Sequence, residues 1–441
     1  MKRTILLKFT VAIIAICFLT APLYSQDTLQ LSIKEALQIA LSENLTVKIA
    51  DKEIAKTKYV EKGMYGSLFP QIDFSGNYQR TIKKQTMYME DQEIKFGLDN
   101  TWSTGFSLGM PLISAPLWKS LKISAMDVEL SIEKARGSRI DLIDQVQQCF
   151  YSALLATDSY AVYKENYDNA VRSYNDVKKK YESGKTSKYD LIRAQVTMQN
   201  AEPGMYDAQN YIVLIQWKLK ALIGIDLKTN IKCIGQLSDF QNVLANIPNG
   251  DTTLLNNNTQ LKQLAMQMNI LDQTYKMQLA KYYPTLNLSL SWQWSAMTNN
   301  FKFSTFKWNP YAIGGVSLVI PIFSGGQRYH TLKQTRVQQE QLEMQKENVK
   351  RDLEVSIKQT LSSMETCVKQ YNAAQMSIEG AQTGYSISLK RYEIGSGTLL
   401  ELDASRLALL QARLNLNQSV YNFLVAKSSL EKIFGESINK Q

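Results

Sequence analysis

The chain has 441 residues, of which 44% are hydrophobic and 20% charged, with 50 Lys and Arg against 40 Asp and Glu. This composition excludes a disordered chain and a multi-span helical membrane protein. The formal net charge of +10 raises the question of nucleic-acid binding. With only 9 prolines and 21 glycines, the chain has few breaks for a protein built from many short, loop-linked modules.

Residues 1–25 have the pattern of a secretory signal peptide. Three cations precede an apolar run of about 11 residues, Phe9 to Leu19, which is too short to span a bilayer. We predict cleavage after Ser25. The alternatives are an uncleaved membrane anchor and a lipoprotein cysteine at Cys17.

Cleavage removes three cations and lowers the net charge from +10 to about +7. The remaining cations alternate with acids, as in residues 176–182, which is typical of a solvated helix face. A secreted chain has little access to nucleic acid, so we expect no nucleic-acid partner. The chain has one histidine, His330, and widely spaced cysteines, so we expect no metal and no cofactor.

An internal repeat is the most informative feature of the sequence. The segments 181–191 (YESGKTSKYDL) and 392–402 (YEIGSGTLLEL) lie 211 residues apart, and three further pairs of short segments occur in the same order in the two halves at similar spacing. Such a repeat predicts two structurally equivalent halves. We divide the chain into the signal peptide (1–25), a first repeat (26–230), a linker (231–258) and a second repeat (259–441).

Each half begins with a predicted helix, at about 33–64 and 259–282. Two runs follow in which apolar and polar residues alternate. The four runs are Ile72 to Tyr78, Trp102 to Met110, Leu286 to Trp294 and Ala312 to Ile320. This pattern predicts tilted membrane-spanning strands with an apolar face toward lipid, although half-buried strands of a soluble sheet show it too. Aromatic residues near the ends of the runs favour the membrane. They are Tyr78, Trp102, Trp292, Trp294, Trp308 and Tyr311.

Long helices are predicted after each pair of strands, because no proline lies between Pro116 and Pro203 or after Pro321. A helix from about Trp118 to Tyr181 would have roughly 64 residues and a length of ~95 Å. The apolar residues from Leu407 to Leu424 step by three and four, as in a coiled-coil seam. We expect the chain to turn back at the repeated segments 181–191 and 392–402. Pro203 and Gly204 should break or kink the first returning helix.

Four strands cannot close a barrel, and open sheet edges in lipid leave backbone groups without partners at several kcal/mol each. Closure therefore requires further copies of the chain. Two copies give 8 strands and a bore filled by side chains, whereas three give 12 strands and an open lumen. The homotrimer is the smallest open form.

This layout resembles the TolC-like outer-membrane efflux protein family over about residues 30 to 436. A Y-x-x-G-x-x-[S/T]-x-x-[D/E]-L turn occurs in both halves, and Val319 to Gly326 is similar to the strand-to-helix exit of the family. The resemblance implies a mainly α fold with β, forming a homotrimer in the outer membrane of a Gram-negative bacterium. A 12-stranded transmembrane β-barrel, four strands per chain, continues into a long α-helical coiled-coil barrel across the periplasm.

The implied function is an exit duct for substrates that an inner-membrane pump and a periplasmic adaptor protein deliver, with drugs and other small molecules as the first expectation. A type I protein secretion channel and a periplasmic coiled-coil adaptor are the alternatives. An adaptor needs only one hairpin, and a plain porin has more strands. We expect no enzymatic activity, because His330 has no Ser/Asp constellation beside it in the sequence and Gly184-Lys185 lacks the Walker spacing.

The resemblance also implies that the helical-hairpin tips contact the adaptor. These residues are Gly184, Lys185, Thr186, Ser187, Gly395, Ser396, Gly397, Thr398 and Leu399. Glycine permits a turn with positive φ and a close approach, and small hydroxyls cap the returning helix. The alternative is that these residues only form the turn.

The resemblance also implies that polar links between the hairpins close the periplasmic entrance. Asp190 and Tyr392 occupy positions of such links, and the acids Glu401 and Asp403 belong to the same entrance. The sequence departs from the family pattern at Gly397, where an arginine link can stand, and at Ala404, where a second acid would be. A plain surface role for these carboxylates is the alternative.

Overall fold

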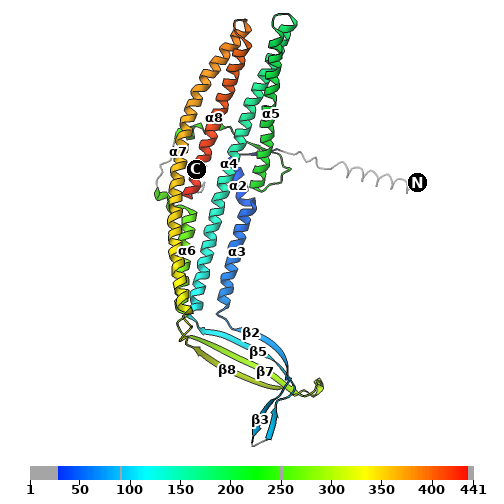
Figure 1. Ribbon diagram of the computed structural model, residues 1–441, viewed down its shortest axis with the longest axis vertical. Coiled ribbons are helices and arrows are strands. Elements are labelled where there is room, and N and C mark those ends of the chain that lie inside the picture. Colours follow the sequence, from blue (N-terminus) through cyan, green and yellow to red (C-terminus); the bar gives the residue numbers. More distant parts are fainter. Residues whose placement is uncertain (1–27, 90–91, 246, 248–251, 436–441) are drawn as a thin grey trace, which may run out of the picture. The chain divides into compact units, whose positions relative to one another are not determined.

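The computed structural model describes residues 28–89, 92–245, 247 and 252–435 (Figure 1). The predicted signal peptide lies outside these residues. The chain forms two compact units, each built from both halves of the sequence. The hairpin unit comprises residues up to 47, 139–251 and from 356 onward, and the sheet unit comprises 48–138 and 252–355.

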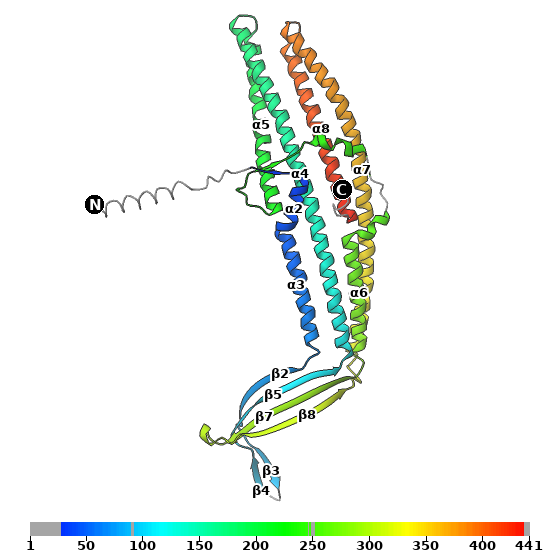
Figure 2. The same ribbon diagram turned by 180° about the vertical axis from the view of Figure 1, so that it is seen from behind.

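Four long helices form two antiparallel hairpins, which Figures 1 and 2 show as neighbouring pairs. Helix α4 (Ala115–Glu182) has 68 residues and returns through α5 (Lys188–Ile223). Helix α7 (Gln327–Glu393) has 67 residues and returns through α8 (Leu399–Phe434). The predicted long helices and the positions of both turns are confirmed.

The helix does not break at Pro203, because α5 continues through this residue; the predicted kink stays a prediction. Gly204 shows what favours the continuous helix. A Cβ atom at this position would lie 3.3 Å from the ring of Tyr163 on α4, so the glycine lets the two helices of the first hairpin approach closely. Packing along the hairpin offsets the hydrogen bond that proline cannot donate.

The buried face of α8 differs from the predicted seam. Leu402, Arg406 and Leu409 are buried, whereas the seam residue Leu407 is 62% exposed. The rest of the predicted seam is covered in part: Leu424 is buried, and the seam residues between Leu407 and Leu424 are half-buried.

The hairpin unit also contains several short elements. Strand β1 (Leu29–Leu31) pairs in parallel with β6 (Ile231–Cys233), and the 3-10 helix η1 (Leu237–Ala245) follows. The first helix is predicted as one element but is interrupted at Asn44, giving α2 (Ile33–Glu43) and α3 (Leu45–Gly66). The side chain of Asn44 donates to the carbonyl of Leu222 at 2.7 Å, so a long-range contact stabilises the interruption.

A four-stranded antiparallel sheet forms the centre of the sheet unit, in the order β2-β5-β7-β8 (Figures 1 and 2). The strands are β2 (Gln71–Arg80), β5 (Asn100–Ile113), β7 (Thr285–Thr298) and β8 (Asn309–Val319). All four overlap the predicted runs, and only Ile320 of the fourth run lies outside its strand.

The register of the sheet places the predicted apolar residues on one face. Phe74 is opposite Phe106, which is opposite Trp292, which is opposite Ala312. Residues opposite each other on neighbouring strands share a face, and the side-chain period is two. The alternation read from the sequence therefore corresponds to one apolar face, here called the apolar face, and one mostly polar face, which also carries Tyr311 and Ile313 of β8.

The sheet unit also contains a β-hairpin that the sequence pattern did not predict. Strands β3 (Gln85–Met89) and β4 (Gln92–Phe96) pair with each other in the connection between β2 and β5. The five residues of each strand contain too few alternating positions to stand out from a loop.

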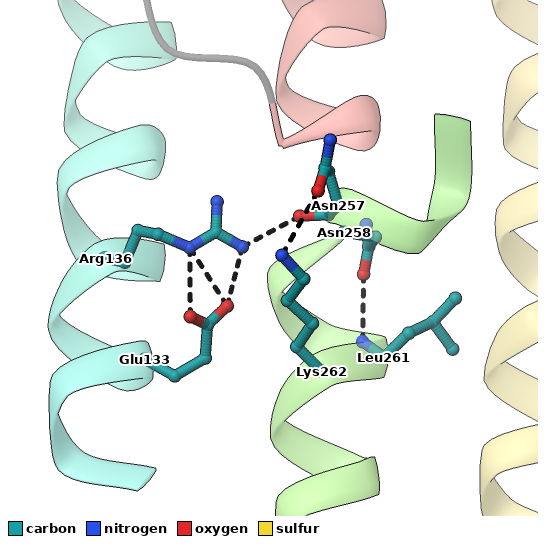
Figure 3. Close-up of polar contacts among 6 residues, drawn as sticks. All are labelled: Glu133, Arg136, Asn257, Asn258, Leu261 and Lys262. Carbon is teal, nitrogen blue, oxygen red and sulfur yellow. Dashed lines mark hydrogen bonds and ion pairs between the residues drawn. The ribbon is translucent and has the colours of Figure 1, made fainter. Parts of the chain in front are cut away.

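The second half begins at an Asn-rich stretch, residues 256–258. Figure 3 shows Asn257 and Asn258 with their contacts. The 3-10 helix η2 (Thr252–Asn257) leads into α6 (Thr259–Ala280), and Asn258 caps α6 by accepting from the Leu261 N–H at 3.0 Å. Arg136 of α4 binds the buried Glu133 and donates to the Asn257 carbonyl at 2.8 Å. This bond holds the start of α6 against α4.

Among the described residues, no helix combines the length and apolar character required to cross a membrane.

Candidate functional site

The two hairpin tips share one backbone arrangement, in which a glycine ends the outgoing helix with positive φ. Gly184 has φ 70° and Gly395 has φ 77°. At the first tip the Lys185 N–H donates to the Lys180 carbonyl at 2.8 Å and the Gly184 N–H to the Tyr181 carbonyl at 2.9 Å. This pair of bonds defines the Schellman motif.

The second tip repeats these bonds. The Ser396 N–H donates to the Arg391 carbonyl at 2.9 Å and the Gly395 N–H to the Tyr392 carbonyl at 3.2 Å. The left-handed conformation that both turns require explains why glycine stands at each position. The sequence repeat is therefore also a repeat of backbone geometry.

A side-chain cap starts each returning helix. Ser187 Oγ accepts from the Asp190 N–H at 3.1 Å, and Thr398 Oγ1 accepts from the Glu401 N–H at 3.2 Å. Both acids lie in the first turn of their helix, where a negative charge is favourable near the helix N-terminus.

The carboxylate of Asp190 belongs to the first turn itself. Ser187 Oγ donates to its Oδ2 at 2.7 Å and Thr186 Oγ1 at 2.9 Å. The hydrogen bonds from Ser187, and further ones from Thr186, lower the pKa of Asp190 below its ordinary value. Thr186 and Ser187, predicted as adaptor contacts, thus also close the turn.

The second tip is held differently. Arg391 lies 3.5 Å from the carboxylate of Glu401 and donates to the Ser396 carbonyl at 3.3 Å. Gly397 donates its N–H to the Arg391 carbonyl at 3.0 Å. A Cβ atom at Gly397 would lie 3.0 Å from Arg391 Cβ and 3.2 Å from the Tyr392 nitrogen, so a side chain at this position would require these neighbours to shift by a few tenths of an ångström.

An apolar cluster joins the two hairpins just behind the tips. Its buried residues come from α4, α5 and α8, and are Val177, Ala194, Leu399 and Leu402. Tyr392 packs against this cluster, and the Lys180 ammonium lies 4.2 Å from the centroid of its ring. The predicted contact residue Leu399 is only 4% exposed, so its side chain belongs to the cluster.

Tyr392 lies in an acidic environment. Burial raises the pKa of its phenol, and the nearby carboxylates of Asp190, Asp176 and Asp403 raise that pKa further. Within the described part of the chain, no hydrogen bond joins Tyr392 to Asp190. The structure therefore brings Asp190 and Tyr392 close enough for an electrostatic interaction. Asp190 accepts hydrogen bonds from Thr186 and Ser187, whereas the ring of Tyr392 contacts Lys180.

Asp403 is the centre of a polar cluster between the hairpins. It lies 3.0 Å from Arg406 on its own helix and 3.7 Å from Arg193 on α5, and Thr197 Oγ1 donates to it at 3.2 Å. The side chains of Asp403 and Arg406 are 14% and 9% exposed. The pair with Arg406 lies within α8, so only Arg193 and Thr197 connect Asp403 to the first hairpin. Loss of the carboxylate would leave the buried Arg406 without a compensating charge.

Sequence reasoning missed Arg193, Thr197 and Arg406 in this cluster. The spacing of Asp403 and Arg406, three residues apart on a helix, is the one signal that could have indicated an ion pair. The contacts from α5 join residues 206 or more positions apart, which no local pattern reveals. In the parts of the chain that the structure describes, no group of three His, Cys, Asp or Glu residues is placed to hold a metal ion.

Comparison with known proteins identifies the family. The family model described as outer membrane efflux protein matches residues 36–225 and 252–436, so the chain belongs to this family. It is a channel protein of the outer membrane and not an enzyme.

Two relatives cover most of the chain. The alkaline protease secretion protein AprF of Pseudomonas aeruginosa is 22% identical over 424 residues, 92% of this chain and 85% of AprF. The cobalt-zinc-cadmium resistance protein CzcC of Cupriavidus metallidurans is 22% identical over 416 residues, 92% of this chain and 90% of CzcC. Among solved structures, the CmeC outer membrane channel of Campylobacter jejuni has the same fold, with a TM-score of 0.74 at 18% identity over 91% of this chain and 85% of CmeC.

Proposed function

We propose that three copies of this chain form an exit duct through the outer membrane and the periplasm. The open four-stranded sheet supports this most directly. Within the described residues, β2 pairs only with β5 and β8 only with β7, so each chain has two open edges and one apolar face. In lipid these edges need partners, and β2 of one copy against β8 of the next provides them. Three copies make a 12-stranded barrel with a lumen.

The helical hairpins of three copies would continue this barrel as a helical tube. The exposed side chains of Leu400 and Leu407 on α8 offer a surface for a neighbouring helix. A duct of this kind has no energy source of its own. We therefore propose that a periplasmic adaptor binds the tips and connects the duct to an inner-membrane pump.

The tips have the accessible polar groups that such docking needs. Lys185 and Ser396 are exposed at corresponding positions of the two turns. The cluster around Asp403 and the ring of Tyr392 hold the two hairpins together behind them. In this proposal the tips recruit the adaptor, and separation of the hairpins at Asp403 opens the entrance.

Small molecules and drugs are the proposed cargo. The similarity to CzcC, named for cobalt-zinc-cadmium resistance, supports an efflux role. The similarity to AprF, named for alkaline protease secretion, supports type I protein secretion as the second candidate. The two candidates share the duct and differ in the pump that feeds it.

Cysteine crosslinking tests the assembly. Single cysteines at Ser75 of β2 and Ser317 of β8, combined in one chain and scanned by two residues along each strand, should yield covalent dimers and trimers at one register. Each cysteine alone is the control and should yield no ladder. A monomeric native mass, with no crosslink at any register, would contradict the trimer.

Complementation tests docking and cargo together. A deletion strain of the source organism should regain drug tolerance with the wild-type chain but not with Lys185→Glu/Ser396→Glu, because the added charges oppose docking. Lys228→Glu, on an exposed loop outside the tips, is the charge control and should complement. If drug tolerance is unchanged by deletion while a secreted protein disappears, the secretion candidate replaces drug efflux.

A further inference from the structure

The connection between β7 and β8 has a composition that the duct itself does not explain. Residues 299–308, here called the aromatic-lysine loop, read NNFKFSTFKW and contain three Phe, one Trp and two Lys but no acid. The loop includes the short 3-10 helix η3 (Phe303–Thr305) and lies at the far ends of β7 and β8 (Figure 1).

The loop packs over the end of the apolar face. The ring of Trp102 lies 5.5 Å from that of Phe303 and 5.9 Å from that of Phe306, and Phe301 lies 5.7 Å from Tyr78. Trp102 and Tyr78 are paired across β5 and β2 in the register of the apolar face. The aromatic-lysine loop therefore extends that face beyond the last paired residues.

Polar contacts fix the base of the loop. Asn299 Oδ1 accepts from Lys84 Nζ at 3.2 Å and from the Asp99 N–H at 3.0 Å. Lys84 also lies 2.9 Å from the Asp99 carboxylate, so this acid is already paired. The positive charges of Lys302 and Lys307 thus have no neutralising acid within the loop.

The outward side of the loop combines exposed rings and exposed ammonium groups. Phe303 is 66% exposed, and Phe301 and Trp308 are exposed as well. Lys302 and Lys307 alternate with these rings along the chain and are both exposed. In water this arrangement leaves apolar area uncovered, whereas the boundary of a membrane accommodates both kinds of group.

We propose that the aromatic-lysine loop binds anionic, phosphate-bearing lipid headgroups at the outer surface of the membrane. The proposal rests on the proposed function, since the apolar face must face lipid. The rings would enter the region between headgroups and acyl chains, and the two lysines would contact phosphate groups. Each cation near an anionic surface contributes about a fivefold gain in binding, so the lysines favour anionic over neutral lipids.

Native mass spectrometry of the purified full-length protein tests this proposal. The protein in nonionic detergent is mixed with equal amounts of phosphatidylglycerol and phosphatidylcholine, and the retained lipids are counted. The wild type should retain phosphatidylglycerol at least fivefold more than phosphatidylcholine. Lys302→Gln/Lys307→Gln should lose this preference. The control Lys58→Gln/Lys95→Gln removes two exposed cations elsewhere in the sheet unit and should keep it.

Three results would overturn the proposal: equal retention of both lipids by the wild type, an unchanged preference in Lys302→Gln/Lys307→Gln, or an equal loss in the control. The same spectrum reports the oligomeric mass. A monomer would contradict the proposed trimer and leave the lipid preference readable, so the two proposals fail separately.

Discussion

The two hairpin tips have the same backbone and different side-chain chemistry. Gly184 and Gly395 make the same turn, and Ser187 and Thr398 cap the returning helices in the same way. At the first tip Asp190 is bound by hydroxyls within its own turn. At the second, Arg391 reaches Glu401 and a backbone carbonyl.

This difference shows which parts of a duplicated turn are constrained. The positive φ of the glycine and the helix cap are required by backbone geometry, and they recur. The position after the turn is not constrained in this way: Thr186 stands at the place in the first repeat that Gly397 occupies in the second. Both tips therefore share the glycine turn and the helix cap, whereas each binds its acid in its own way.

The largest effect is expected from Asp403→Asn, which tests whether the hairpins are joined mainly behind the tips. The change leaves Arg193 and Arg406 without their carboxylate, and we expect a local loss of about 2–3 kcal/mol. Hydrogen exchange of residues 188–197 would measure it. Glu401→Gln is the control, because its pair with Arg391 is exposed and contributes less than about 0.5 kcal/mol. Equal effects of the two changes would contradict the role given to Asp403.

Exchange of the residues that differ between the tips should have the next largest effect. Gly397→Thr gives the second tip the residue of the first, but its Cβ meets the backbone of Arg391 and Tyr392, and we expect a cost of about 1–3 kcal/mol. The reciprocal Thr186→Gly removes one hydrogen bond to Asp190 and should cost about 1 kcal/mol. Hydrogen-exchange rates of the amides in each turn measure both costs. A larger cost for Thr186→Gly than for Gly397→Thr would contradict this prediction.

Substitution of the shared glycines should affect both tips equally. Gly184→Ala and Gly395→Ala place a Cβ in open space but in a left-handed conformation, at a cost of about 1 kcal/mol each. The same exchange measurement applies. A difference of more than about 0.5 kcal/mol between them would show that the turns are not equivalent.

The smallest difference in stability between the two tips is expected at low pH. The hydroxyl bonds lower the pKa of Asp190 in the folded chain, so its contribution is fully present above the ordinary carboxyl pKa of about 3.9. That contribution is lost as the pH falls through the lowered value. Amide exchange of residues 184–190, corrected for intrinsic rates, should accelerate below pH 4 in the wild type. In Asp190→Asn this pH-dependent part should be absent.

Local patterns in the sequence determined the four strands of the main sheet, its apolar face, the long helices and both turns. They did so because side-chain period, proline spacing and the glycine requirement at positive φ are properties of neighbouring residues. The tertiary structure decided the interruption at Asn44, the continuity of α5 at Pro203 and the buried face of α8. It also decided the partners of Asp403. Each of these depends on contacts between residues distant in the chain, where packing outweighs local preference.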